Sequence, residues 1–174
     1  MNAMLRASGF LVLLLLSSPL FAKWEVRTGL RAGYAVVTVD REETGRAYGG
    51  AVGGEGLWAR GPFGVSAGLD YYDAEDAGDV LTVSFDALAR WRMRGDRTAW
   101  IALGRSTVDV GNDVGSTSVW APSAGYSWPL GKRQLLVTVR HHNAARHIDP
   151  RFRAEELNTT MLMVGIRSSN LLEW

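Results

Sequence analysis

The sequence predicts an all-β chain: an eight-stranded antiparallel transmembrane β-barrel over residues 23–174, preceded by a cleaved signal peptide over residues 1–22. Three observations carry this prediction. Apolar and polar residues alternate in eight separate segments, the connections between the segments are short and long in turn, and the chain begins with a short apolar run after a single charge. Period-2 alternation is the pattern of a strand with one apolar face. In a membrane barrel that face turns outward to lipid.

The N-terminal 22 residues have the three parts of a secretory signal peptide. Arg6 is their only charge, residues 10–16 are all apolar, and small residues and a proline precede Ala22. These features correspond to a charged n-region, an apolar h-region and a cleavage site. The apolar run is too short to span a bilayer as a helix, which takes about 20 residues. We therefore expect cleavage after Ala22.

The clearest strand is LTVSFDALARWRM, residues 81–93. Every odd position is apolar, and every even position except Leu88 is polar. Asp86, Arg90 and Arg92 therefore share one face of a strand whose other face is apolar. In a membrane barrel these three ionisable groups would lie in the interior.

Seven further segments complete the predicted barrel. Segments 24–36 and 63–71 alternate cleanly, 46–58 is weaker, and 98–105 could face either way. Pro122 lacks a ladder donor, so we expect a bulge or irregularity there. Segment lengths of about 9–13 residues match tilted membrane strands, and an even count suits a closed barrel. The eight segments are 24–36, 46–58, 63–71, 81–93, 98–105, 119–128, 134–142 and 157–167.

The connections and the tryptophans predict the orientation. Connections 60–62, 94–97 and 129–133 are short and contain Gly with Pro or Asp, as turns require. The others, 40–45, 73–79, 106–118 and 141–156, are longer and polar. Short periplasmic turns and long outer loops are the rule in membrane barrels, so the N-terminus is expected on the periplasmic side. Interfacial aromatic residues are then predicted in a lower girdle of Trp24, Trp58, Trp91, Trp100 and Trp128, and an upper one of Trp120, Tyr34, Tyr48 and Tyr71.

Composition excludes several classes of function. The chain contains no cysteine, which excludes disulfides, thiolate metal sites and a lipid anchor on Cys. Removing Arg6 with the signal peptide lowers the 19 Lys and Arg residues to 18, against 18 Asp and Glu. A neutral mature chain argues against nucleic acid as a partner.

With these features, residues 23–174 resemble the small eight-stranded outer-membrane barrels of Gram-negative bacteria, the OmpA and OmpX type of transmembrane domain. The resemblance implies an outer-membrane protein with a structural or surface-interaction role and no catalysis. It implies outer-membrane lipid and lipopolysaccharide as partners, a monomer, and no cofactor. The terminal Trp174 is typical of chains handled by the outer-membrane assembly machinery, although residues 168–174 do not continue the alternation.

Parity along the strands predicts what fills the barrel. An eight-stranded barrel is packed by its own side chains, and an unpaired buried charge costs several kcal/mol. We therefore expect Glu55 and Asp86 to contact inward arginines, with a narrow ion path as the alternative to a closed interior. Parity also places Arg92, His142 and Arg167 inside. The predicted interior ion-pair network is Arg27, Arg31, Glu55, Asp70, Asp86, Arg90 and Arg140.

A catalytic hypothesis rests on the segment RHHNAARHIDP, residues 140–150, which we interpret as part of an outer loop. It is weakly similar to the His-x-Ser-Asn-Ala motif of lipid A deacylases, which are also barrels. The similarity implies His141 as a base and Glu155 as its orienting partner. However, Asn143 stands where the nucleophilic serine is required. We therefore predict no enzyme, with an altered lipid A acyl hydrolase as the alternative.

Two further interpretations concern the same segment and the class of barrel. His142 and His147 lie five residues apart, which is not a diagnostic metal spacing, so no metal site is predicted. Arg146, Arg151 and Arg153 are candidates for contact with lipopolysaccharide phosphates, because guanidinium groups bind phosphate bidentately. A soluble periplasmic barrel that binds an apolar ligand, as lipocalins do, is the remaining alternative.

Overall fold

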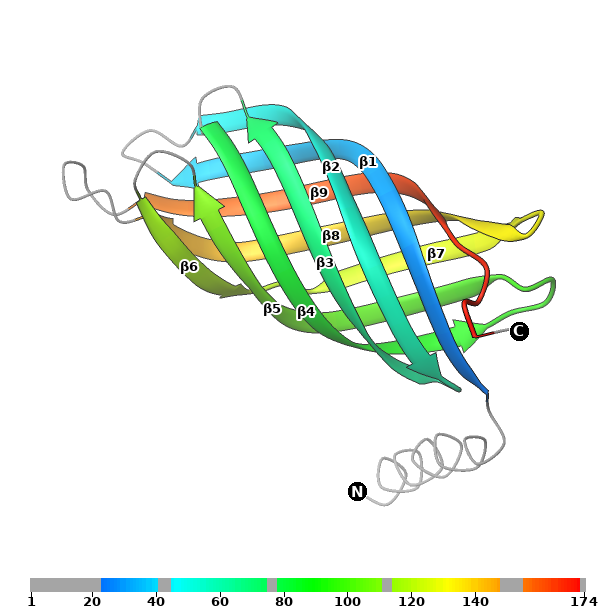
Figure 1. Ribbon diagram of the computed structural model, residues 1–174. Coiled ribbons are helices and arrows are strands. Elements are labelled where there is room, and N and C mark those ends of the chain that lie inside the picture. Colours follow the sequence, from blue (N-terminus) through cyan, green and yellow to red (C-terminus); the bar gives the residue numbers. More distant parts are fainter. Residues whose placement is uncertain (1–22, 41–44, 75–77, 111–113, 148–154, 173–174) are drawn as a thin grey trace, which may run out of the picture.

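The chain forms one closed antiparallel barrel in a computed structural model, which describes residues 23–40, 45–74, 78–110, 114–147 and 155–172 (Figure 1). The sheet runs in the order β4-β3-β2-β1-β9-β8-β7-β5-β6, and pairing of β4 with β5 closes it. Its segments are β1 Trp24–Asp40, β2 Gly45–Arg60, β3 Phe63–Ala74, β4 Gly78–Arg92, β5 Thr98–Val110, β6 Val114–Trp120, β7 Ser123–Leu130, β8 Arg133–His147 and β9 Glu155–Arg167. Within the described ranges, no helix has the length and apolarity to cross a membrane.

Segments β6 and β7 are two parts of one barrel strand, interrupted at Ala121 and Pro122. Both parts pair with β5. Segment β6 pairs with residues 105–110 of β5, and β7 pairs with residues 98–102. Across the gap, the Ala121 amide donates to the Gly104 carbonyl and the His141 amide donates to the Pro122 carbonyl, each at 3.0 Å. The irregularity expected at Pro122 is therefore confirmed, and so is the eight-stranded antiparallel barrel.

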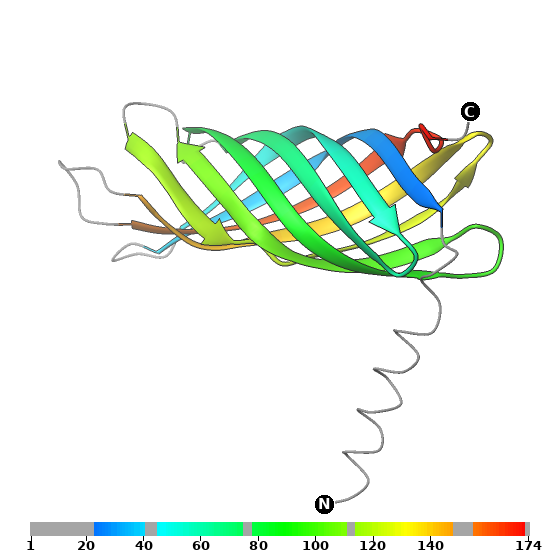
Figure 2. The same cartoon turned by 60° about the horizontal axis from the view of Figure 1, so that its bottom comes forward.

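The three short turns lie together at one end of the barrel (Figure 2). Gly61 and Pro62 join β2 to β3, residues 93–97 join β4 to β5, and two residues join β7 to β8. Gly95 and Asp96 have φ values of 71° and 56°, in the left-handed region where glycine is favoured and aspartate is enriched over most other residues. At the opposite end, the residues between the strands (41–44, 75–77, 111–113 and 148–154) lie outside the described residues.

The strands extend further toward that opposite end than the sequence predicts. The expected loop 106–118 is wrong in its bounds, because β5 continues to Val110 and β6 begins at Val114. The expected loop 141–156 is also too long, because β8 reaches His147 and β9 begins at Glu155. Polar residues there continue the hydrogen-bonded ladder, with a register shift between His142 and Ala145. Polarity alone therefore does not end a strand in this chain.

The outer surface of the barrel is apolar. Leu30 and Phe85 are 75% and 67% exposed, and outward aromatic residues flank this band at both ends. Trp24, Trp58, Phe63 and Trp91 lie near the short turns, and Tyr34, Tyr48, Tyr71 and Trp120 lie toward the other end. Trp100 is an exception to the predicted girdle: it is only 8% exposed and lines the interior. Its ring lies against Gly125 on β7, where a Cβ would overlap it.

The interior has two regions along the barrel axis. Toward the end opposite the short turns it is filled by an apolar cluster, and toward the short-turn end by arginines and carboxylates. We call these regions the apolar plug and the ionic cluster. The described members of the apolar plug are Ala35, Val37, Ala51, Tyr72, Val80, Val108, Val119, Met161 and Met163.

Candidate functional site in the barrel interior

Arg31 is the centre of the ionic cluster. Its Nε and Nη2 donate to the two carboxylate oxygens of Asp70, at 2.9 and 2.7 Å, and its Nη1 donates to Glu55 at 3.0 Å. The register explains how β1 reaches β3: Arg31 pairs with Gly53, which in turn pairs with Asp70. A Cβ at Gly53 would collide with the Asp70 carboxylate. The glycine therefore leaves room for a bidentate pair, the strongest geometry for this interaction.

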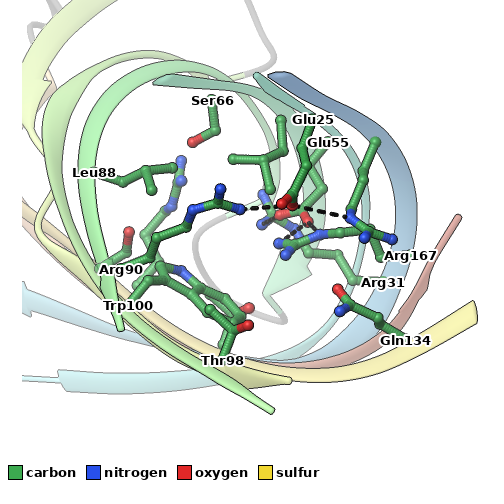
Figure 3. Close-up of a pocket in the computed structure, with 15 residues that line it drawn as sticks. Glu25, Arg31, Glu55, Ser66, Leu88, Arg90, Thr98, Trp100, Gln134 and Arg167 are labelled. Carbon is green, nitrogen blue, oxygen red and sulfur yellow. Dashed lines mark hydrogen bonds and ion pairs between the residues drawn. The ribbon is translucent and has the colours of Figure 1, made fainter. Parts of the chain in front are cut away.

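Glu55 joins a second arginine to this centre. Its Oε1 accepts from Arg167 Nε at 2.7 Å and from the Nη2 of the same guanidinium. The Arg167 guanidinium also lies over the Trp100 ring, 4.9 Å from the centroid, in a cation–π contact. Figure 3 shows Glu55, Arg31 and Arg167 converging, with Trp100 on the wall of the same pocket. Because Trp100 faces inward, its ring packs against the Arg167 guanidinium.

Asp86 and Arg140 form an ion pair between strands that are not neighbours. Arg140 Nη2 on β8 donates to Asp86 Oδ2 on β4 at 2.5 Å, and the Ser66 hydroxyl donates to the same oxygen at 3.2 Å. Both charged side chains are almost fully buried. Arg140 Nε, Arg140 Nη1 and Asp86 Oδ1 have no hydrogen-bond partner among the described residues. This pair is therefore the least satisfied part of the ionic cluster.

Glu25 forms the lower edge of the ionic cluster. Its Oε2 accepts from Arg90 Nη1 at 2.7 Å and lies 3.6 Å from Arg27 Nε, while its Oε1 contacts Arg92. Arg92 was expected inside, but 64% of its side chain is exposed at the barrel mouth. Glu25 and Arg167 were not in the predicted network. The signal was available, because Glu25 alternates in step with Arg27 and Arg31.

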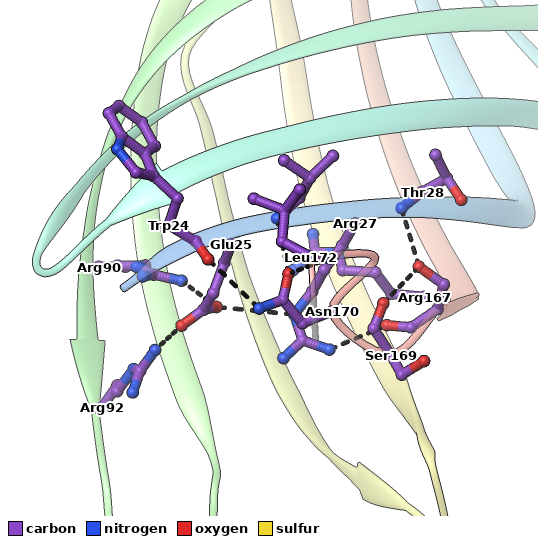
Figure 4. A network of polar contacts seen from close by, with 12 residues as sticks. Trp24, Glu25, Arg27, Thr28, Arg90, Arg92, Arg167, Ser169, Asn170 and Leu172 are labelled. Atoms are coloured by element: carbon purple, nitrogen blue, oxygen red, sulfur yellow. Dashed lines mark hydrogen bonds and ion pairs between the residues drawn. The ribbon is translucent and has the colours of Figure 1, made fainter. Parts of the chain in front are cut away.

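The residues that follow β9 bond to the first residues of β1 at the short-turn end of the barrel (Figure 4). Asn170 Oδ1 accepts from the Val26 amide at 2.9 Å, and Asn170 Nδ2 donates to the Trp24 carbonyl at 3.3 Å. Arg27 Nη1 donates to the Ser168 carbonyl at 2.9 Å. Residues 168–172 therefore continue the pairing of β1 without strand alternation, which explains why their sequence departs from the period-2 pattern.

The catalytic candidates do not come together. His141 Nδ1 lies 2.9 Å from the Thr160 hydroxyl, and neighbouring Arg140 and His142 point inward. The register pairs His141 with Thr160 but Glu155 with His147. Thr160 and Glu155 are five residues apart, about 16 Å along a strand. The backbone therefore separates the base from its supposed partner, and residues 141–147 belong to β8 rather than to a loop.

The remaining candidates fall partly outside the described structure. Arg151 and Arg153 lie outside the described residues, and the side chains of Arg146, His147 and Glu155 are not described. His142 is 1% exposed, and neither ring nitrogen has a partner among the described residues. In the part of the chain that the structure describes, no group of His, Asp or Glu side chains could hold a metal ion.

Comparison with known proteins bears on the fold. No protein-family model matches the sequence, and no curated protein sequence matches it either. Among solved structures, Neisserial surface protein A superimposes with a TM-score of 0.63 at 12% identity, over 82% of this chain and 96% of its own. The fold is that of a small outer-membrane β-barrel. Ail of Yersinia pestis (TM-score 0.41, 15% identity, 82% of this chain and 99% of its own) and the N-terminal domain of Pseudomonas aeruginosa OprF (0.39, 13%, 83% and 99%) also match.

Proposed function

We propose that this chain is an integral outer-membrane protein of a Gram-negative bacterium, with a structural or surface-interaction role and no catalysis. On this proposal, residues 1–22 direct export and are removed. The outer-membrane assembly machinery then inserts residues 23–174, and the protein works as a monomer. The observation that carries the proposal is the apolar band on the outside of a closed barrel whose inside is charged.

The dimensions of this band support lipid as its surroundings. Trp24 and Tyr34 on β1 both face outward and lie ten residues apart, which is about 33 Å along a strand. At the usual strand tilt of about 40°, this corresponds to about 25 Å along the barrel axis, the height of the apolar band in membrane barrels. Leu30, between them, is 75% exposed. In water, a continuous apolar belt of this kind would favour aggregation.

The same arrangement argues against the lipocalin-like alternative. A lipocalin holds an apolar ligand inside a barrel with a polar outer surface. Here the polarity is reversed, and Arg31, Asp70 and Arg140 fill the interior where a ligand would lie. The part of the interior that is apolar is occupied by side chains such as Met161 and Met163, both fully buried.

We assign the surface role to the end of the barrel opposite the short turns. We infer that Arg146, Arg151 and Arg153 contact phosphates of lipopolysaccharide there, because a guanidinium fork matches phosphate geometry. Loss of these arginines should weaken retention of the purified protein on lipopolysaccharide-coated beads. The acyl pattern of lipid A, read by mass spectrometry, should be the same with and without the protein. Release of an acyl chain would instead support the hydrolase alternative.

Cell fractionation tests the proposed location. We expect the mature chain in the outer-membrane fraction, resistant to extraction by carbonate or urea, with faster gel migration before boiling than after. A soluble periplasmic pool would contradict the proposal.

A pair of substitutions tests the lipid-facing surface directly. Leu30→Arg places a charge at mid-band and should lower the free energy of unfolding in lipid vesicles by about 2–4 kcal/mol, whereas a charge near the interface costs about 0–1 kcal/mol. Leu130→Arg, at the end of β7 beside a short turn, is the matched control. Equal effects of the two substitutions would mean that the outer surface does not face lipid.

A further inference from the structure

The ionic cluster encloses a small cavity that its own side chains do not fill. Its volume is about 30 Å³. A cavity needs at least about 10–15 Å³ to hold a water-sized guest, so this one has room for a small ion. The charged residues in its wall are Glu25, Arg27, Arg31, Glu55, Arg90, Arg140 and Arg167 (Figure 3).

Two arginines in this wall keep unused hydrogen-bond donors. Arg140 is 3% exposed, and its Nε and Nη1 have no partner among the described residues. Arg90 is 5% exposed, and its Nη2 also has no partner among the described residues. Both side chains are fixed in place, Arg140 by Asp86 and Arg90 by Glu25 and the Gly61 carbonyl. The unpartnered donors therefore belong to a rigid, preformed site.

The unused groups around the cavity favour an anion. Five arginines line it, and arginine stays protonated in proteins. The carboxylates bonded to them are Glu25 and Glu55 in the wall and Asp70 and Asp86 outside it, and Glu25 also contacts Arg92. Among the described residues of the wall, both oxygens of Glu25 and of Glu55 are already paired, so the unused charged groups are donors. Asp86 Oδ1, the unpartnered acceptor, belongs to a residue outside the cavity wall.

The cavity adjoins a wider, more polar space. A wider vestibule of about 400 Å³ at the short-turn end shares Glu25, Arg27, Thr98 and Gln134 with its wall. The other charged residues of this vestibule are Arg92, Lys132 and Arg133, against Asp96 alone, so its field attracts anions. At the opposite end the apolar plug blocks the interior with fully buried Val37, Met161 and Met163. Among the described residues, the interior is therefore open toward the short turns and filled toward the opposite end.

We propose that this cavity is a binding site for a small inorganic anion of the size of chloride. The anion enters through the short-turn vestibule and accepts hydrogen bonds from Arg140 and Arg90. It does not pass through the barrel.

Chloride binding can be measured on the full mature barrel in detergent micelles. We expect saturable broadening of the ³⁵Cl NMR signal that bromide competes away. We also expect a higher thermal unfolding midpoint in chloride than in gluconate at the same ionic strength, since gluconate is too large for the cavity. Identical midpoints together with no broadening would overturn the proposal.

Variants locate the site. Asp86→Asn combined with Arg140→Gln removes both members of one ion pair, so the barrel keeps its net charge while the site loses two donors. We expect chloride to bind at least tenfold more weakly to this double variant. Arg105→Gln is the matched control, because Arg105 is exposed on the outer face and bonds to Ser118. Equal weakening in both variants, or in neither, would show that chloride does not bind in this cavity.

Planar bilayer recordings test the closed end. Saturable chloride binding without stepwise conductance is the expected combination. Stepwise chloride conductance in the unaltered protein would contradict a one-ended pocket.

Discussion

The apolar plug and the ionic cluster occupy the same barrel and are built from the same strands, yet they are held together differently. On β1, Arg31 belongs to the ionic cluster, and Ala35 and Val37, four and six residues further along the same inward face, belong to the plug. The plug is filled by apolar side chains that pack against each other. Its single described side-chain hydrogen bond joins the hydroxyls of Tyr72 and Thr159 at 3.1 Å. The ionic cluster is filled by arginines and carboxylates whose positions are set by hydrogen bonds and ion pairs.

This difference predicts different tolerance to mutation. An apolar region accepts changes that conserve volume and suffers from cavities. A buried ionic region accepts little, because removing one partner leaves the other charged and unpaired. The plug therefore seals the barrel, while the ionic cluster fixes which strands lie opposite each other.

The largest effect is expected at Glu55, which serves two arginines. Glu55→Gln removes the charge that both Arg31 and Arg167 depend on. We expect the free energy of unfolding to fall by about 3–5 kcal/mol, measured by urea titration of tryptophan fluorescence in lipid vesicles. Asp79→Asn, at an exposed carboxylate bonded to Tyr71, should leave the midpoint unchanged. A Glu55→Gln protein as stable as the parent would show that the ion pairs are dispensable.

The plug should respond to volume rather than to chemistry. Met161→Ala creates a cavity at a fully buried site and should cost about 2–4 kcal/mol. Met161→Leu conserves volume and should cost less than about 1.5 kcal/mol. Urea titration under the same conditions measures both. Similar losses for the two substitutions would mean that Met161 contributes something other than packing.

The alternation of polar and apolar residues along the strands predicts which charged residues belong to the ionic cluster in many cases. Parity assigned Arg31, Asp70 and Asp86 to the interior because each lies on the polar face of a regular strand. Alternation could not predict that Asp86 meets Arg140, since that contact joins strands from opposite sides of the barrel and depends on closure. The predicted network already contains more arginines than carboxylates, but which of their donors stay unpartnered depends on these contacts across the barrel.

Trp100 shows the limit of local pattern most clearly. Segment 98–105 has apolar residues on both faces, so parity left its orientation open, and a girdle position was expected by analogy with the other tryptophans. The deciding feature is Gly125 on the neighbouring segment, which pairs with Trp100 and leaves space for the ring. That pairing is known only once β5 and β7 are in register.

The space beside Trp100 gives the next prediction. Gly125→Ala would push a methyl group into the ring and displace it from Arg167, so we expect a loss of about 1–3 kcal/mol from overpacking. Gly50→Ala is the matched control, because a Cβ there meets nothing within 4 Å. Urea titration compares stability, and near-ultraviolet circular dichroism reports on the tryptophan environment. An equal response of both variants would mean that the close approach at Gly125 is not required.

The smallest effect is expected where the ionic cluster meets the C-terminal residues. Asn170→Ala removes the acceptor of the Val26 amide and the donor to the Trp24 carbonyl. Water can replace part of these bonds at the barrel mouth, so the loss should be about 0.5–1.5 kcal/mol. Hydrogen exchange at the Val26 amide should accelerate, while exchange at Ala35, in the plug, stays unchanged. Ser169→Ala is the control, because the bond at Ser169 is made by its backbone carbonyl. If exchange at Ala35 accelerated as well, the two regions would open together, and the plug would not be an independent seal.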